Sequence, residues 1–139
     1  MRGIADTGLI VALLAADDPF HKWAANSFRS HSPFFSCDAV LAEACSSFSN
    51  PVPVLTLVSR GDLILDFDLA AEMPRVFALT AKYLDRPMDL ANAGVVRMTE
   101  LHARCKVWTV DRDDFATYRR HGRQSVPCEF PPSKNLGAE

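Results

Sequence analysis

The start of the sequence places a single charge in a segment that is otherwise uncharged. Asp6 is the only charged residue within residues 3–16, and an apolar run over residues 9–16 follows it. An ionised carboxylate in so apolar a setting is costly unless a hydrogen-bond donor, a cation side chain or a metal ion pairs with it. We therefore expect a short buried strand over residues 2–6, a turn, and an apolar helix over residues 9–16. The rest of the chain must supply the partner of Asp6.

The composition indicates one globular domain without an overall basic field. The 139 residues are 48% hydrophobic and carry a formal net charge of -2, so a nucleic-acid partner would need a local basic patch. The four cysteines lack C-x-x-C spacing, and we expect free buried thiols in a reducing compartment. Acidic residues inside and just after the N-terminal apolar run argue against a signal peptide, and no stretch is long enough to span a bilayer. We expect a cytoplasmic protein.

Strand and helix patterns alternate along the chain. Strands are expected over residues 2–6, 34–36, 63–67, 106–110 and 126–130. Helices are expected over residues 9–16, 19–30, 39–48, 53–60, 69–84 and 88–104. This alternation predicts an α/β fold with a central parallel sheet of about five strands. We expect one domain over residues 1–131 and a polar C-terminal tail over residues 132–139.

Two of the predicted strands end at acidic residues. Asp6 ends the first strand and Asp111 follows the fourth. Ligands of parallel sheets bind outside the carboxyl ends of the strands, so these carboxylates would meet if the two strands are neighbours. Glu43 is the only charge within the predicted helix over residues 39–48. We expect Glu43 and one face of the helix over residues 88–104 to complete the cluster.

Taken together, these motifs make the sequence resemble a PIN domain, and among PIN domains the toxin ribonucleases of VapBC-type toxin–antitoxin pairs. The segments that carry the resemblance are ADTG at residues 5–8, DPFH at 18–21, DAVLAEA at 38–44, KYLDRPMDLANA at 82–93 and TVDRDDF at 109–115. Their order and spacing are more specific than any one of them. The resemblance extends to about Pro131 and implies a three-layer α/β/α fold.

The resemblance implies phosphodiester cleavage that depends on Mg²⁺ or Mn²⁺. Clustered carboxylates would hold the ion, which prefers oxygen ligands and activates a water molecule for attack on phosphorus. The first, second and fourth acids of the family fall on Asp6, Glu43 and Asp111, which we expect to be the catalytic residues and metal ligands. Thr7 and Thr109 match small polar positions that are expected to orient ligands.

The third acid of the family pattern is missing. Asn92 stands where the family usually has aspartate, and it can offer a neutral carbonyl oxygen but no charge. Asp89, one helical turn earlier, remains as a further ligand, and Asp114 is expected to support the site. The resemblance thus implies a metal-dependent endoribonuclease toxin. The alternative is a PIN domain with weakened or lost catalysis that binds RNA or a partner protein.

The partners implied by the resemblance are an RNA substrate, a small cognate antitoxin and a second copy of the chain in a homodimer. The expected RNA contacts are the basic residues after the fourth strand, namely Arg112, Arg119, Arg120 and Arg123. They could form a phosphate-binding rim, or they could belong to a solvated surface turn. Tyr118, which lies next to these arginines in the sequence, is the one candidate for stacking on a base.

Structural roles compete with the metal-ligand interpretation for the first two acids. Asp6 could cap the apolar helix over residues 9–16, because aspartate is a favoured N-cap. Glu43 could form an ion pair with an arginine such as Arg60 or Arg97. The metal hypothesis has the advantage that one constellation explains Asp6, Glu43 and the acid after the fourth strand together.

Structural roles are equally available to the later acids. Asp89 would stand in the first turn of its helix, where negative charge is favoured in any case. Asp111 could be a turn residue, with Asp113 or Asp114 capping the short turn at Phe115. Glu100 is expected to pair with Arg104, four residues later on the same helix.

Overall fold

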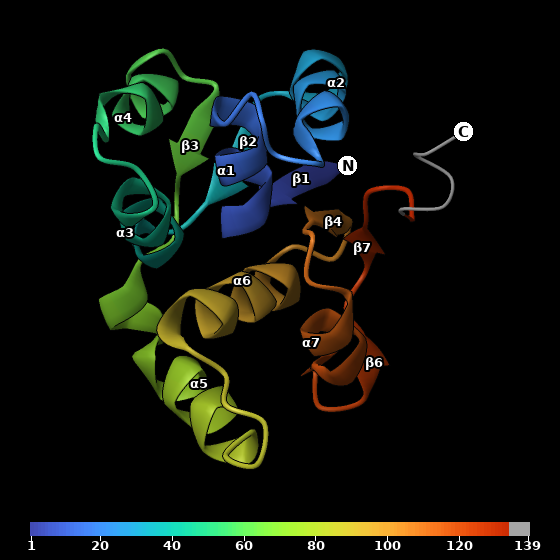
Figure 1. Ribbon diagram of the computed structural model, residues 1–139. Helices are drawn as coiled ribbons and strands as arrows, with labels where there is room; N and C mark the ends of the chain where they lie inside the picture. Colours follow the sequence, from blue (N-terminus) through green and yellow to red (C-terminus); the bar gives the residue numbers. More distant parts are fainter. Residues whose placement is uncertain (134–139) are drawn as a thin grey trace.

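A five-stranded parallel sheet forms the centre of the computed structural model, which describes residues 1–133 (Figure 1). The strands are β1 (Arg2–Ala5), β2 (Phe34–Ser36), β3 (Leu63–Leu65), β4 (Cys105–Trp108) and β7 (Cys128–Glu129). Their order across the sheet is β3-β2-β1-β4-β7, and all four pairings are parallel. The predicted number and direction of the strands are confirmed. Most of the predicted tail, residues 134–139, lies outside the described part of the chain.

Within residues 1–133, seven helices flank the sheet. They are α1 (Thr7–Leu14), α2 (His21–His31), α3 (Asp38–Ser46), α4 (Val52–Ser59), α5 (Leu69–Lys82), α6 (Leu90–Leu101) and α7 (Arg112–Thr117). A small antiparallel hairpin of β5 (Arg119–Arg120) and β6 (Gln124–Ser125) follows α7. The sequence patterns did not predict this hairpin. Its turn contains Gly122 at a φ of 82°, a conformation that glycine adopts without steric cost.

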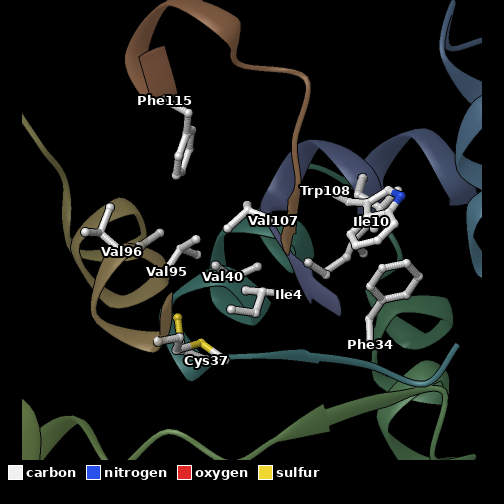
Figure 2. Close-up of a cluster of buried hydrophobic side chains, with 14 of the residues drawn as sticks. Ile4, Ile10, Phe34, Cys37, Val40, Val95, Val96, Val107, Trp108 and Phe115 are labelled. Atoms are coloured by element: carbon white, nitrogen blue, oxygen red, sulfur yellow. The ribbon is translucent and has the colours of Figure 1, made fainter. Parts of the chain in front are cut away.

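The two faces of the sheet bury different sets of side chains. Ile4 and Val107, which are register partners in β1 and β4, are fully buried on the side of α6. Figure 2 shows Trp108 and Phe34 grouped apart from them, near Ile10 of α1. A side chain in a strand points to the face opposite that of its neighbour, so adjacent residues serve two layers. The result is the three-layer α/β/α arrangement.

Helix α1 begins close against the segment that follows β4. A Cβ atom added to Gly8 would clash with the side chain of Val110. Glycine therefore permits this approach, which brings the ends of β1 and β4 and the start of α1 to one place. The close packing positions the residues on either side of it, Asp6 and Thr109.

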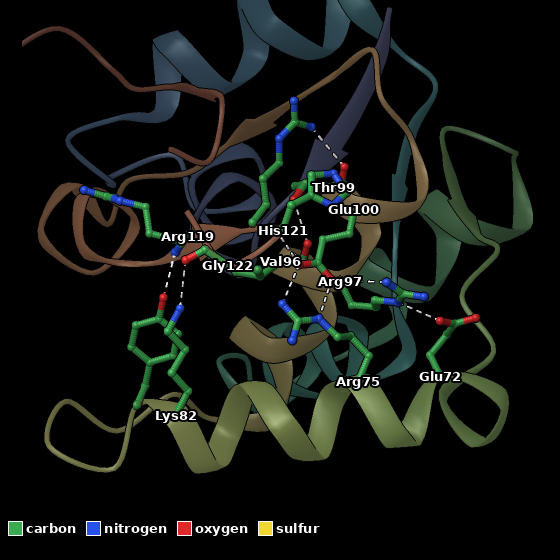
Figure 3. A network of polar contacts seen from close by, with 12 residues as sticks. Glu72, Arg75, Lys82, Val96, Arg97, Thr99, Glu100, Arg119, His121 and Gly122 are labelled. Carbon is green, nitrogen blue, oxygen red and sulfur yellow. Dashed lines mark hydrogen bonds and ion pairs between the residues drawn. The ribbon is translucent and has the colours of Figure 1, made fainter. Parts of the chain in front are cut away.

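A buried carboxylate joins α5, α6 and the hairpin (Figure 3). The Glu100 side chain is 1% exposed and accepts two hydrogen bonds from Arg75, at 2.8 and 2.7 Å. It also accepts from Arg97 at 3.1 Å and from the backbone N–H of His121 at 2.7 Å. Burial alone would raise the pKa of Glu100, but these donors lower it to about 2. The expected pairing with Arg104 is wrong.

The four cysteines are free thiols, as expected. Cys37 and Cys105 are buried, whereas Cys45 and Cys128 are only half-buried, so the prediction of burial holds for two of them. Within residues 1–133, no helix has both the length and the apolar character needed to cross a membrane.

Candidate active site

The candidate site lies where β1 and β4 end side by side. Ala5 is the register partner of Trp108, and the Asp6 backbone N–H donates to the Trp108 carbonyl oxygen at 3.1 Å. The next residues, Asp6 and Thr109, therefore face each other directly after the sheet. The condition that the two strands are neighbours is met, although 103 residues separate the two side chains in sequence.

Asp6 is buried with only one of its two carboxylate oxygens satisfied. The side chain Oδ2 accepts a hydrogen bond from the Thr109 hydroxyl at 2.7 Å, and the residue is 5% exposed. The same hydroxyl oxygen accepts the backbone N–H of Asp111 at 3.1 Å, which orients the hydroxyl proton toward Asp6. The Oδ1 atom of Asp6 is buried and has no hydrogen-bond partner within residues 1–133, and the same holds for Thr7 Oγ1.

The environment of Asp6 disfavours an uncompensated negative charge. Burial raises the pKa of its carboxyl group, the Thr109 hydroxyl and the Thr7 backbone amide lower it, and the charges of Glu43 and Asp111 raise it again, to about 6. Asp6 is the N-cap residue of α1 by position, but its side chain makes no capping hydrogen bond. The capping alternative is therefore wrong. The site instead has the properties of one that gains from a bound cation.

Glu43 is exposed on α3, and neither of the arginines considered as its partner pairs with it. Arg60 contacts Asp62 at 3.6 Å, and Arg97 binds Glu72 at 2.7 Å. The ion-pair alternative is wrong for both. The Glu43 charge acts on Asp6 electrostatically, so the two acids belong to the same region of the molecule.

Asp111 is half-buried and caps α7. Its Oδ1 atom accepts the backbone N–H of Asp114 at 3.1 Å, so Asp111, rather than the expected Asp113 or Asp114, is the capping residue. Burial and its interaction with the Asp114 side chain raise the pKa of Asp111. Asp114 accepts a hydrogen bond from Arg86 at 2.9 Å and its pKa is lowered by the interactions with Asp111 and Arg86. Asp114 is therefore engaged in an ion pair.

Helix α6 contributes Asp89 and Asn92. Asp89 caps the helix by accepting the backbone N–H of Asn92 at 2.8 Å, which confirms the structural role that the sequence allowed. The Asn92 side-chain Nδ2 donates to the hydroxyl of Tyr118 at 3.2 Å. Tyr118 is fully buried, with its ring 5.1 Å from that of Tyr83 and 5.4 Å from that of Phe115. It therefore offers no stacking surface to a base.

The predicted acids share one end of the sheet without forming a closed cage. Within the described residues, no group of three His, Cys, Asp or Glu side chains is close enough to hold a metal ion. What the structure brings into direct contact is the pair of Asp6 and Thr109, with the Asp111 backbone attached to it. Glu43 and Asp111 act on Asp6 through their charges. Asp89 accepts a hydrogen bond from the Asn92 backbone, and the Asn92 side chain donates to Tyr118.

The basic residues after β4 are largely occupied by the protein itself. Arg112 donates to Pro131 O and lies over the Phe130 ring, Arg119 donates to Ala116 O and Tyr118 O, and Arg120 donates to Thr99 O. Arg123 is exposed in the hairpin turn. Three of the four guanidinium groups thus tie backbone carbonyls together.

Sequence reasoning did not anticipate the link between Asn92 and Tyr118 or the pairing of Arg86 with Asp114. These partners are 26 and 28 residues apart. No local spacing rule relates residues so far apart, because helical neighbours are three or four positions away and strand neighbours two.

Comparison with known proteins shows a solved structure of similar fold. No protein-family model matches the sequence, and no curated protein matches it either. Among solved structures, the chain is similar to VapC20 of Mycobacterium tuberculosis, a toxin that cleaves the sarcin-ricin loop. The TM-score is 0.71 at 16% sequence identity, and the match covers 81% of this chain and 92% of VapC20. The chain therefore has a VapC-like PIN fold.

Proposed function

We propose that this protein is a metal-dependent endoribonuclease, the toxin of a toxin–antitoxin pair. The observation that carries the proposal is the buried Asp6 carboxylate, one oxygen of which has no partner within residues 1–133. It lies at the carboxyl end of a parallel sheet whose fold is that of an RNA-cleaving toxin. A buried carboxylate with a raised pKa at such a sheet edge is a frequent property of functional sites.

The residues present fit Mg²⁺ or Mn²⁺. Asp6 Oδ1 and Thr7 Oγ1 are buried oxygen atoms without hydrogen-bond partners in the described chain, and oxygen is the ligand that these ions prefer. Glu43 and Asp111 add negative charge around them. Mg²⁺ commonly keeps several waters and uses only one or two carboxylates, so a closed cage of three acids is not required.

We assign the ion to Asp6, Glu43 and Asp111, with Asp89 and the carbonyl oxygen of Asn92 as the contributions of α6. A bound divalent ion would supply a hydroxide nucleophile and neutralise charge on the phosphate. The protein's part is orientation. The Thr109 hydroxyl holds Asp6 Oδ2, which leaves Oδ1 free to face a ligand.

The fold also supports the proposed partners. We propose an RNA substrate, a small antitoxin that silences the site, a homodimer and a cytoplasmic location, with residues 1–131 as the domain that carries these functions. Phosphate contacts are assigned to Arg112, Arg119, Arg120 and Arg123. Of these, Arg123 is the most available, because the other three donate to backbone carbonyls.

A second candidate function is a PIN domain that binds RNA or a protein without efficient cleavage. The contact of Asn92 with Tyr118 favours it. The amide nitrogen is directed to the tyrosine, so this position contributes at most one neutral oxygen where an aspartate would contribute a charge. A lower charge weakens the attraction for a divalent ion.

The deciding experiment is an RNA cleavage assay with Mg²⁺ or Mn²⁺. It compares wild type with Asp6→Asn and Asn92→Asp, and uses Asp17→Asn, which alters an exposed carboxylate, as the matched control. We expect wild type and the control to cleave, and Asp6→Asn to lose more than about 100-fold in rate. Unimpaired cleavage by Asp6→Asn would refute the metal site. An inert wild type alongside an active Asn92→Asp would refute the ribonuclease proposal for this protein and favour the second function.

A further inference from the structure

A cavity of the described chain lies beside α2, on the opposite face of β4 from α6. It has a volume of about 940 Å³. Its walls include Trp23 and His31 of α2, Trp108 of β4, Glu129 of β7, and Ser133 of the segment after β7. We call this cavity the α2 pocket. In Figure 1, α2 lies above the ends of β4 and β7, and the chain passes them on its way to the C-terminus.

The walls of the α2 pocket are unusually aromatic. The rings of His31 and Trp108 are 5.0 Å apart, and Trp108 packs edge-on against Phe34 at 5.2 Å. Trp23 and Phe20 also line the cavity, and both are only partly buried. Flat rings at the mouth of a cavity are suited to stacking on another planar ring, and each nucleobase offers such a surface.

The charge around the pocket favours an anion. Helix α2 carries Lys22 and Arg29 but no acidic residue. Lys22 lines the cavity. Glu129 is the one carboxylate of the lining, and Lys106 neutralises it through an ion pair at 3.1 Å. Lys22 beside these aromatic rings matches, with a single cation, the combination of positive charge and aromatic rings by which proteins hold single-stranded nucleic acid.

The pocket is also linked to the candidate active site. Trp108 lines the cavity with its side chain, while its carbonyl oxygen accepts the backbone N–H of Asp6. The residue after it, Thr109, donates to the Asp6 carboxylate. Trp108 therefore belongs both to the pocket wall and to the backbone that holds Asp6 and Thr109.

We propose that the α2 pocket binds an unpaired nucleotide of the RNA on which the proposed ribonuclease acts. The base stacks on Trp23 and His31, and Lys22 contacts the adjoining phosphate. The proposal rests on the proposed function. It adds a preference for single-stranded RNA and a site at which that RNA is held outside the acidic cluster.

The two tryptophans give this proposal a direct readout. The sequence contains only two, Trp23 and Trp108, and both line the α2 pocket. Tryptophan fluorescence therefore reports on this cavity alone. Titration with single-stranded hexaadenylate in EDTA, which prevents metal-dependent cleavage, should quench the emission to a plateau. A blunt RNA duplex of the same length should quench it far less.

Variants then test the residues. Because stacking on an aromatic side chain contributes about 1–3 kcal/mol per base, Trp23→Leu should weaken hexaadenylate binding by about 5- to 150-fold, measured by anisotropy of a labelled strand. Lys22→Gln, on the exposed side of α2, should lower the slope of log affinity against log salt by about 0.7. Arg60→Gln removes an exposed cation that does not line the pocket and is the matched control.

The outcomes separate this proposal from the proposed function. Quenching with loss of binding in Trp23→Leu and Lys22→Gln supports the pocket even if wild type fails to cleave RNA with Mg²⁺ or Mn²⁺. Cleavage with unchanged KM in both variants and no quenching overturns the pocket while the ribonuclease stands. If the Leu136→Asp substitution changes the tryptophan emission while RNA does not, the pocket is assigned to residues 134–139 and the proposal is overturned. Equal loss of affinity in the Arg60→Gln control would also overturn it.

Discussion

Replacing Asp6 by asparagine should stabilise the metal-free protein at neutral pH. The pKa of Asp6 is raised from 3.8 to about 6, mainly by burial, so the folded state binds a proton more tightly than the unfolded state does. By linkage, stability falls as pH rises from about 4 to 6, and the loss is complete above the folded pKa. This difference in pKa means that ionisation of Asp6 lowers the free energy of unfolding by about 3 kcal/mol above pH 7 and by about 0.5 kcal/mol near pH 4. Asp6→Asn removes this pH-dependent loss of stability.

The measurement is urea unfolding in EDTA at several pH values, with the free energy of unfolding obtained by linear extrapolation. The difference in free energy between Asp6→Asn and wild type should increase by about 2–3 kcal/mol from pH 4 to pH 8 in favour of the variant. Asp17→Asn, which alters an exposed carboxylate, controls for general charge effects. Mg²⁺ should then stabilise wild type but not Asp6→Asn. A difference that does not change with pH would refute the argument that Asp6 is destabilised by burial.

Three further substitutions test a hydrogen bond, a buried ion pair and a close packing contact. Thr109→Val should cost about 1–3 kcal/mol of stability and raise the pKa of Asp6, measured by NMR titration of the carboxyl carbon; an unchanged pKa would contradict the hydrogen bond. Glu100→Gln should cost about 3–5 kcal/mol at pH 7 by urea unfolding. Because the pKa of Glu100 is lowered to about 2, the stability that its ionised carboxylate contributes is present above about pH 4.5 and is lost as pH falls toward 2. The difference in free energy of unfolding between wild type and Glu100→Gln should therefore decrease in acid. Gly8→Ala should cost about 1–3 kcal/mol, and Val110→Ala in the same chain should restore much of the loss in thermal melts.

Much of the fold could be predicted from local patterns. The five strands appear within a few residues of their predicted positions, because short apolar runs bounded by turn residues specify buried strands. The hairpin of β5 and β6 escaped prediction, since its strands are two residues long and consist of arginine, glutamine and serine. Its attachment to Glu100 through the His121 backbone depends on a contact across 21 residues.

The surroundings of Asp6 could be predicted only in part. The sequence placed acids after β1 and β4 but left open whether the two strands are neighbours, and the structure pairs them. A structural role for Asp89 at the start of its helix was available from the sequence, and the structure shows it as the helix cap. The capping role of Asp111 was not predicted, because the sequence pattern favoured a later aspartate as the cap. The position of the Asn92 amide against Tyr118 was not available, because it depends on how α6 packs against the segment after α7.

The sequence by itself determined that Asp6 would be a buried charge in need of a partner. Hydrophobic patterning sets which residues enter the core, and a lone carboxylate within an apolar run must follow them. Only the tertiary structure decided which groups surround it. The register of β1 against β4 brings Thr109 to one carboxylate oxygen and leaves the other without a partner in the described chain. Register is a property of the assembled sheet and its two packed faces, and no local segment contains it.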